Sequence, residues 1–388
     1  MALIIKNSEN NRSRAMRKIA ILTLNGYFNY GNRLQNYAMQ EVLENLGFYC
    51  ETIINDRAKG GASLAKRINN LRKNSIKDIY IKTYYRIWRN IRKDTIAKRT
   101  EEFKSFTLNY IKETDYAISK SDISGNLSER YDYFVTGSDQ VWNPQNLHGS
   151  SIYFLTFAEK HKRIAYAPSF GVSEIKPEYI ENYKKCLSGM HKLSVREDDG
   201  AKIIKKLTGR QAPVLVDPTL LLTKDKWLSI AKEAGNKPKG KYLLTYFLGG
   251  IPDNYKRQIK NIVKENKLEE INLGDIREKE TYRTGPSEFI GYINDCSIFC
   301  TDSFHGAVFS ILLEKPFIVF ERIGSTSMYS RIDTLLNKFK LNSRKVENMS
   351  WGDDVFKIDF SHVSQILDVE RKKALDYLKK SLETKDAN

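Results

Sequence analysis

Short apolar runs rich in β-branched residues recur along this chain, and stretches with helical spacing separate many of them. The strand-length runs are Ile19–Leu24, Tyr131–Thr136, Ile164–Ala167, Leu193–Val195, Val214–Val216, Tyr242–Phe247, Ile271–Leu273, Ser297–Cys300 and Phe317–Phe320. The helical stretches include Leu34–Leu46, Gly200–Leu207, Lys224–Glu233, Tyr255–Asn266, Ala307–Leu313 and Val363–Leu382. This alternation predicts an α/β fold with largely parallel sheets.

The length of 388 residues favours two domains. A polar stretch with Gly and Pro at 235–240 precedes a new strand, and Asp217-Pro218-Thr219 is a second candidate linker. We predict two Rossmann-like, doubly wound domains facing each other across a cleft. They span 17–222, with a basic helical insertion at about 60–105, and 223–360. A closing helix and tail over 361–388 would pack on both domains.

Several classes of protein are excluded or disfavoured. A composition of 41% hydrophobic and 29% charged residues excludes a disordered chain. No apolar run is long enough to cross a bilayer, and Met1–Lys18 does not resemble a secretory signal, so we expect a cytoplasmic protein. Four scattered cysteines do not form a disulfide framework. Cys296 and Cys300 lack a second ligand pair, so no metal site is predicted.

Most of the net charge of +17 lies in one segment. Between Arg57 and Lys104 there are 15 Lys plus Arg against 4 Asp plus Glu, a net +11. Apolar residues recur at helical spacing from Ile68 to Ile91, so we predict a basic amphipathic helix. Such a helix either lies on the anionic inner leaflet or packs on a domain with its basic face in solvent. No helix-turn-helix, zinc finger or RNP pattern is present, so nucleic acid is not a predicted partner.

Ligands bind beyond the carboxyl ends of strands in open α/β sheets, and the first two such places here are rich in polar residues. The loop 25–33 offers backbone N–H groups and a helix N-terminus to an anion or a sugar hydroxyl, or it is a simple capped turn. After Thr136, Asp139 could accept a proton from a sugar hydroxyl while Trp142 stacks on the sugar. The alternative for Asp139 is an Asx turn or a helix cap.

Two further strand ends place an arginine and a histidine. Arg196 precedes acidic residues at a helix start, where it either clamps an anion or pairs with Glu197 or Asp198. His305 follows a strand near a helix N-terminus, which disfavours the imidazolium and leaves a group suited to proton exchange near neutral pH. A purely structural histidine is the alternative.

Taken together, five motifs resemble the polysaccharide pyruvyl transferase family. They are Asn29-Tyr30-Gly31-Asn32-Arg33-Leu34-Gln35-Asn36-Tyr37-Ala38, Gly137-Ser138-Asp139-Gln140-Val141-Trp142-Asn143, Ser194-Val195-Arg196-Glu197, Val216-Asp217-Pro218-Thr219-Leu220-Leu221 and Thr301-Asp302-Ser303-Phe304-His305-Gly306. The resemblance runs from about Lys18 to about Leu341. It implies a GT-B-like fold and transfer of the enolpyruvyl unit of phosphoenolpyruvate, without a cofactor, onto two hydroxyls of one sugar.

The resemblance also implies roles for individual residues. His305 would be the general acid, with Asp139 as the second catalytic residue, and Arg196 would bind the phosphate or carboxylate of the donor. Ser303 and Gly306 would lie at the donor, whereas the acceptor side would comprise Asn29, Gly31, Asn32, Ser138, Gln140 and Trp142. The expected acceptor is a sugar or lipid-linked oligosaccharide of a bacterial capsule, exopolysaccharide or cell-envelope glycan. The basic helix would then hold the enzyme at the inner membrane face.

One position departs from the family pattern. Characterised members often carry an arginine where this chain has Ser303, and a hydroxyl cannot neutralise a donor's charge. Either Arg322, Arg331 or Lys315 takes over, or the donor differs. The alternative hypothesis is therefore a GT-B-type glycosyltransferase that uses a nucleotide sugar in the same pathway.

Overall fold

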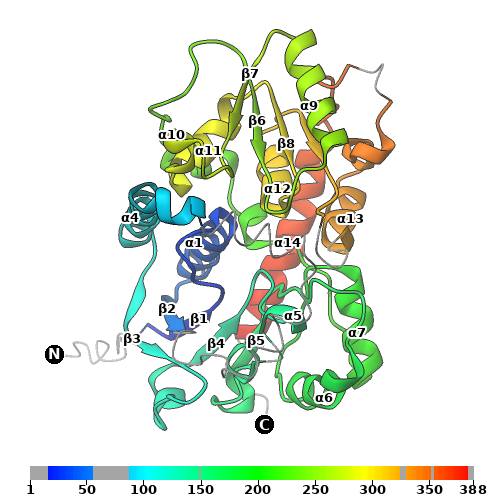
Figure 1. The fold of residues 1–388 in the computed structure, drawn as a ribbon. Coiled ribbons are helices and arrows are strands. Elements are labelled where there is room, and N and C mark those ends of the chain that lie inside the picture. The colour runs from blue at the N-terminus through cyan, green and yellow to red at the C-terminus, as the bar shows by residue number, and fades with distance from the viewer. Residues whose placement is uncertain (1–15, 56–86, 148–149, 324–328, 351–353, 383–388) are drawn as a thin grey trace, which may run out of the picture.

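The computed structural model describes residues 16–55, 87–147, 150–323, 329–350 and 354–382. Two parallel sheets, one in each half of the chain, define an N-terminal lobe and a C-terminal lobe (Figure 1). Most of the predicted basic amphipathic helix falls on residues 56–86 and so lies outside the described residues. Within the described ranges, no helix is long and apolar enough to span a bilayer.

The sheet of the N-terminal lobe has the strand order β3-β2-β1-β4-β5, with every neighbouring pair parallel. Its strands are β1 (Lys18–Leu22), β2 (Tyr49–Asn55), β3 (Glu113–Ile118), β4 (Tyr133–Thr136) and β5 (Arg163–Ala165). β1 and β4 lie in the middle, in the register Ile21 to Val135, and their apolar side chains are fully buried or nearly so. Reversal of the strand order between β1 and β4 makes the carboxyl ends of these two strands the place where ligands usually bind.

The sheet of the C-terminal lobe has the order β7-β6-β8-β9 and is also parallel. Its strands are β6 (Tyr242–Tyr246), β7 (Glu269–Asn272), β8 (Ile298–Thr301) and β9 (Phe317–Val319). Every residue of β6 and β8 is buried, as expected for central strands covered by helices on both faces. The carboxyl end of β8 leads directly into a helix that begins at Phe304.

Helices connect the strands in both lobes. In the N-terminal lobe they are α1 (Tyr30–Asn45), α4 (Lys93–Tyr110), α5 (Pro144–Leu147), α6 (Ile180–Ser188) and α7 (Asp198–Thr208). Those that follow are α8 (Lys224–Ile230), α9 (Asp253–Glu265), α10 (Lys279–Tyr282), α11 (Pro286–Asp295), α12 (Phe304–Leu312) and α13 (Tyr329–Lys338). Short 3-10 turns are η2 (Leu127–Arg130), η3 (Ser151–Phe154), η4 (Lys160–Lys162), η5 (Pro177–Tyr179), η6 (Pro218–Leu221), η7 (Asn342–Arg344) and η8 (Val346–Asn348).

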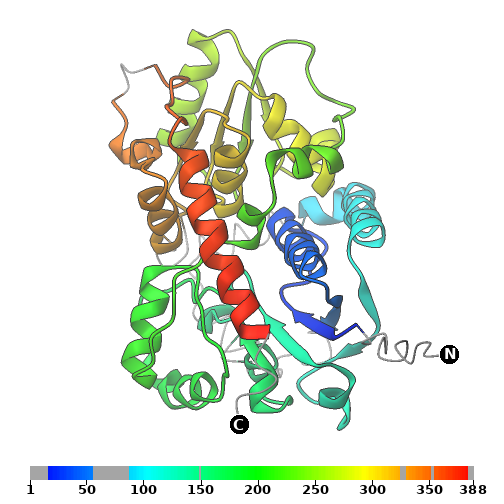
Figure 2. The same ribbon diagram turned by 180° about the vertical axis from the view of Figure 1, so that it is seen from behind.

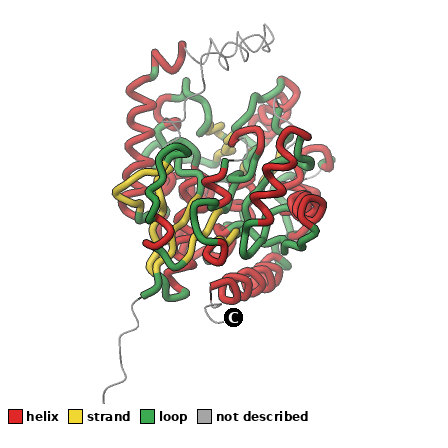
Figure 3. Tube along the Cα trace, turned by 90° about the horizontal axis from the view of Figure 1, so that it is seen from below, coloured by secondary structure: helices red, strands yellow, loops and turns green. Residues whose placement is uncertain are grey.

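The last helix, α14 (Val363–Leu382), runs back from the C-terminal lobe along the N-terminal lobe (Figure 2). Arg371 donates from Nε to the carbonyl of Leu220 at 2.8 Å, and the Tyr377 hydroxyl donates to the carbonyl of Ala165 at 2.8 Å. Viewed from below, α14 lies on the outside of the molecule (Figure 3). Lys338 of α13 also donates from Nζ to Glu370 Oε2 at 2.8 Å, so α14 contacts both lobes and the predicted C-terminal helix is confirmed.

The predicted α/β class, with two doubly wound parallel sheets, is confirmed. Two of the predicted strands are wrong, because Leu193–Val195 and Val214–Val216 form only isolated bridges, such as Val195 to Val214. Residues 49–55 and 113–118 form β2 and β3, two strands that the sequence prediction did not include, and β3 lies at the edge of the sheet. The predicted domain boundaries at 222 and 360 stay predictions.

Candidate active site

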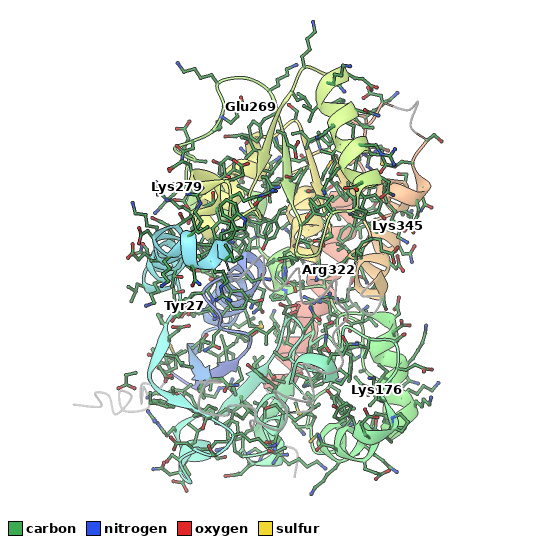
Figure 4. All side chains as sticks on the ribbon, viewed as in Figure 1. Tyr27, Lys176, Glu269, Lys279, Arg322 and Lys345 are labelled. Carbon is green, nitrogen blue, oxygen red and sulfur yellow. The ribbon has the colours of Figure 1, made fainter. Side chains whose placement is uncertain are left out.

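Five charged or titratable side chains from both lobes form a buried cluster at the carboxyl ends of the strands. They are Asp139, Arg196, Asp217, His305 and Arg331, which are 6%, 3%, 1%, 5% and 5% exposed. Asp139 follows β4, Arg196 precedes α7, Asp217 precedes η6, and His305 and Arg331 lie in the first turns of α12 and α13. The cluster is thus built where five elements converge. Arg322, after β9, lies near the junction of the two lobes (Figure 4).

Asp217 is the common partner within this cluster. Its Oδ2 accepts hydrogen bonds from Arg196 Nη1 at 2.6 Å and from Ser138 Oγ at 2.9 Å, and it lies 3.5 Å from His305 Nε2. Its Oδ1 accepts from the backbone N–H and the hydroxyl of Thr219, at 3.1 and 2.8 Å. Four of the predicted motifs therefore meet at one carboxylate that was not among the predicted site residues. The available indication was an Asp-Pro pair directly after an apolar run.

The charges around Asp217 keep it ionised. Burial acts to raise the pKa of Asp217, but His305 and Arg196 outweigh burial and hold the pKa well below its ordinary value. The ionised carboxylate of Asp217 therefore lies 3.5 Å from His305 Nε2, and α12 begins one residue before this histidine.

Asp139 lies between two arginines. Its Oδ1 is 3.0 Å from Arg196 Nη2 and 3.8 Å from Arg331 Nη1. Burial acts to raise the pKa of Asp139, but Arg196 and the other nearby cations lower it overall. Asp139 also has a left-handed backbone conformation, with φ at 57°, which Asp tolerates better than most residues. Asp139 is therefore a buried carboxylate in this cluster and not the predicted turn or cap alone.

The two arginines share the ring of Phe304. The guanidinium carbon of Arg196 lies 4.2 Å from the ring centroid, and that of Arg331 lies 6.0 Å from it. Burial, followed by repulsion from Arg196, lowers the pKa of Arg331 to about 10, so Arg331 remains a cation at neutral pH. Two buried cations this close together favour an anion between them.

His305 lies against the N-terminus of α1 from the other lobe. A Cβ placed on Gly31 would lie 2.0 Å from Nδ1 of His305, so only glycine fits there. At the start of α12, the Ser303 hydroxyl accepts from the backbone N–H of Gly306 at 3.3 Å and so caps the helix. A Cβ on Gly306 would lie 2.8 Å from Thr301 Oγ1, which explains glycine at that position too.

The predicted acceptor residues are divided by the structure. Ser138 lies in the cluster and Gly31 touches His305, whereas Asn29 is the N-cap of α1, where its side chain accepts from the N–H of Asn32. The Gln140 side-chain oxygen accepts from Asn143 Nδ2 at 2.6 Å. The first loop therefore combines a helix cap with a direct contact to the histidine.

Trp142 does not lie where the predicted stacking on a sugar requires it. Its side chain is fully buried, its indole Nε1 donates to the carbonyl of Tyr153 at 3.0 Å, and its ring stacks on Phe154 with centroids 5.2 Å apart. The indole is thus packed within the core of the N-terminal lobe, and we correct the predicted role. An aromatic residue after a strand indicates burial as readily as ligand stacking.

Of the three cations considered as substitutes for an arginine at Ser303, Arg331 alone is in the cluster. Arg322 Nε donates to Asp302 Oδ2 at 3.2 Å, and Asp302 in turn accepts from the N–H groups of Leu248 and Gly249. Lys315 precedes β9 and so lies at the amino end of that strand, away from the site. Arg331 is distant in sequence from the motif histidine, so no local pattern favoured it over the others.

Glu197 is a further buried carboxyl group beside the cluster. Its Oε1 accepts from the Phe170 N–H at 2.8 Å and from Ser169 Oγ at 3.0 Å. Burial raises the pKa of Glu197 above its ordinary value. The ion-pair partners of Arg196 are Asp139 and Asp217 rather than the adjacent Glu197 or Asp198. In the described part of the chain, no group of three or more His, Cys, Asp or Glu could hold a metal ion.

The sequence profile of the polysaccharide pyruvyl transferase family matches residues 29–323. The chain belongs to the polysaccharide pyruvyl transferase family. The match includes Asp139, Arg196, Asp217 and His305, whereas Arg331 lies beyond its end. The predicted family is therefore confirmed, and with it a transferase of pyruvyl groups and a polysaccharide acceptor as the family's general activity.

This pyruvyl transferase family member is similar, at low identity, to several solved structures. UDP-GlcNAc 2-epimerase from Neisseria meningitidis bound to UDP-GlcNAc is 10% identical, with a TM-score of 0.48 over 95% of this chain and 99% of that one. A putative UDP-N-acetylglucosamine 2-epimerase from Listeria monocytogenes is 10% identical, with a TM-score of 0.47 over 94% and 90%. Anabaena HepE in complex with UDP and glucose is 10% identical, with a TM-score of 0.41 over 94% and 100%. No curated protein sequence matches.

Proposed function

We propose that this protein transfers the pyruvyl unit of phosphoenolpyruvate onto two hydroxyls of one sugar. The product is a cyclic pyruvate ketal on a bacterial capsule, exopolysaccharide or cell-envelope glycan precursor, and inorganic phosphate leaves. The observation that supports the proposal best is His305, which lies 3.5 Å from the ionised Asp217 and next to two buried arginines. A proton donor beside cations is what protonation of an anionic enol ester requires.

The reaction balances without a redox partner or a cofactor. A proton adds to the vinyl carbon C3, which becomes the methyl group, and positive charge develops at C2. One sugar hydroxyl forms a bond to C2 and loses its proton, and the second hydroxyl then displaces the phosphate. The two hydroxyl protons supply, in total, the proton on the methyl group and the proton on the released phosphate.

Four of the five cluster residues have a role in this scheme, and so does Ser303. His305, which lies beside the carboxylate of Asp217, donates a proton to C3, and Asp139 accepts a proton from the attacking hydroxyl. Arg196 binds an anionic group of the donor, because a guanidinium can donate two parallel hydrogen bonds to a carboxylate or a phosphate. Ser303 keeps the first turn of α12 in place through its bond to the N–H of Gly306.

The contact between Gly31 and His305 adds a step. Nε2 of His305 faces Asp217, and Nδ1 packs against Gly31 of the other lobe. A reactant can therefore take a proton from Nδ1 only after α1 and α12 move apart. We expect the lobes to separate for substrate entry and to close again over the bound reactants.

The test is phosphate release from phosphoenolpyruvate by the purified protein, with a panel of synthetic and lipid-linked glycosides as acceptors. We expect acceptor-dependent release, and a fall of about 10²- to 10⁴-fold for His305→Gln. His161→Gln is the matched control, because His161 is well exposed and remote from the cluster. Mass spectrometry of the product should show a sugar that has gained a ketal.

The runner-up is a glycosyltransferase that uses a nucleotide sugar. The same acceptors are therefore incubated with nucleotide sugars, and nucleotide release is measured. Nucleotide release together with no phosphate release would overturn the proposed donor. Residues 56–86 are outside the described structure, so peripheral contact with the inner membrane face stays a prediction from the basic composition.

A further inference from the structure

The cluster contains an arginine to which no role has been given. Arg331 enters from α13, beyond the residues that match the family, and reaches the same carboxylate oxygen as Arg196. We infer that Arg196 and Arg331 form a two-guanidinium site for one anionic group of the donor, and that Asp139 fills this site as an internal counterion until the anion displaces it. The identity of the donor rests on the proposed function, whereas the anion site does not.

The contacts of Asp139 are those of a replaceable counterion. Arg196 Nη2 donates to its Oδ1 at 3.0 Å, but Arg331 Nη1 lies at 3.8 Å, beyond hydrogen-bonding distance. Asp217, in contrast, accepts hydrogen bonds on both oxygens from three residues. Asp217 is therefore a fixed part of the site. Asp139 is the carboxylate that an incoming anion can replace with the loss of fewer hydrogen bonds.

The ring of Phe304 positions both guanidiniums. The guanidinium carbon of Arg196 lies 4.2 Å from the ring centroid and that of Arg331 lies 6.0 Å from it. A guanidinium over an aromatic ring still donates hydrogen bonds in its own plane, so a carboxylate or phosphate that replaces Asp139 can bind both guanidiniums. Because Phe304 is the neighbour of His305, this anion lies next to the acid.

Arg331 also accounts for the departure at Ser303. The Ser303 hydroxyl is used as the cap of α12 and cannot neutralise charge. Arg331 supplies a second buried cation to the same first turn of the helix from a different element. In this chain, the second cation of the donor site thus comes from α13, whereas in the family pattern it stands at the start of α12.

Displacement of Asp139 couples donor binding to catalysis. While both arginines face Asp139, the carboxylate is a weak base. Once they bind the donor anion, Asp139 loses its stabilising cations and faces a negative group instead, so its proton affinity rises. Asp139 then takes the proton from the attacking hydroxyl, and the base is active only when the donor is bound.

The test measures dissociation constants by calorimetry for the full-length protein, with phosphoenolpyruvate, inorganic phosphate and UDP as separate probes. We expect Arg331→Gln to weaken binding by about 10- to 100-fold. Arg331→Lys should weaken it by less, because Lys keeps the positive charge and loses only the planar pair of N–H donors. Asp139→Asn should tighten binding by about 10-fold, since it removes the competing counterion, while transfer is lost. Lys338→Gln is the matched control on the same helix, because Lys338 pairs with Glu370 outside the cluster. Circular dichroism confirms that each variant is folded.

The outcomes separate this inference from the proposed function. The two-guanidinium site is rejected if phosphoenolpyruvate binds Arg331→Gln and Arg331→Lys as tightly as wild type, or binds Asp139→Asn more weakly. Phosphoenolpyruvate then remains the proposed donor. Binding of phosphate or UDP, but not phosphoenolpyruvate, with the expected responses supports the anion site and overturns the donor. If none of the three probes binds, the anion site is rejected.

Discussion

Buried arginines hold the lobes of this protein together in two regions, and the arginines of the two regions differ in their partners. Arg99 of α4 donates from Nη1 to the Tyr30 hydroxyl and to the carbonyl of Tyr282, each at 2.7 Å, and from Nη2 to the carbonyl of Phe28 at 3.2 Å. Among the described residues, no carboxylate forms an ion pair with it. Arg196 and Arg331 instead face Asp139, and Arg196 also binds Asp217.

The difference separates a fixed contact from an exchangeable one. The contacts of Arg99 with Tyr30, Tyr282 and Phe28, together called the Arg99 latch, use neutral acceptors and aromatic rings, which a substrate anion cannot replace. Tyr30 also stacks on Phe289 of α11, with centroids 4.2 Å apart. In the cluster, the counterion of the arginines is a carboxylate, which has the same negative charge as the expected substrate anion. A buried cation paired with a carboxylate is thus suited to exchange, and one paired with carbonyls is suited to holding structure.

The largest effect is expected for Asp217→Asn, which removes the fixed carboxylate. Loss of one partner from a buried ion pair costs about 3–5 kcal/mol, and transfer should fall about 10²-fold or more because His305 loses its anion. The folded-state pKa of Asp217 is lowered, so its stabilisation is present above the ordinary value of about 3.9 and is lost as pH falls through the folded pKa. Urea denaturation at pH 7 and at pH 3 measures this.

Asp295→Asn is the control for that change, because Asp295 forms a more exposed pair with Lys237. If Asp217→Asn were as stable and as active as Asp295→Asn, Asp217 would not be a fixed part of the cluster, and the contrast with Asp139 would fail.

Arg99→Met should lower the free energy of unfolding by about 2–4 kcal/mol, because it leaves the Phe28 and Tyr282 carbonyls without their donor. Anion affinity should stay within about twofold of wild type, since the Arg99 latch holds no exchangeable group. Denaturation and calorimetry on the same sample test both parts. Lys98→Met, an exposed neighbour on α4, is the control. A large loss of anion affinity in Arg99→Met would remove the distinction between the two regions.

Gly31→Ala should lower the free energy of unfolding by about 1–3 kcal/mol. The added methyl group would lie 2.0 Å from Nδ1 of His305 and so force the lobes apart. The cost should nearly vanish when the same substitution is made in His305→Ala, which removes the ring. A double-mutant cycle in urea measures this coupling. Equal costs in the two backgrounds would show that Gly31 and His305 do not touch in solution.

The smallest effect concerns Glu197, whose folded-state pKa is raised by burial. Such a group contributes stability that is complete below its ordinary pKa of about 4.3 and is lost as pH rises through the folded value. Glu197→Gln keeps an acceptor for the Phe170 N–H and has no charge to bury. As pH rises from 4 to 8, we therefore expect its free energy of unfolding to increase by about 1 kcal/mol relative to that of wild type. A stability difference that does not change over this range would contradict a raised pKa for this buried carboxyl group.

The sequence allowed most of the motif residues to be recognised but not all of their roles. Asp139, Arg196 and His305 lie together as strand ends predict, whereas Trp142 lies in the core, because an aromatic ring at a strand end has the same pattern in either place. Arg99 lies within the basic segment that suggested a solvated face or a membrane contact. Composition does not distinguish it from its exposed neighbours, since burial depends on the second lobe.

The amino-acid sequence by itself determined the alternation of strands and helices, the family, and the set of polar residues at the strand ends, because each depends on local periodicity and short motifs. Tertiary structure alone decided which charges meet. Arg196 and Asp217 are 21 residues apart, Arg196 and Asp139 are 57 apart, and Arg331 arrives from beyond the last motif. Electrostatic pairing acts over a few ångströms, so the partner of a buried charge is set by how the two lobes pack, and no local pattern encodes that distance.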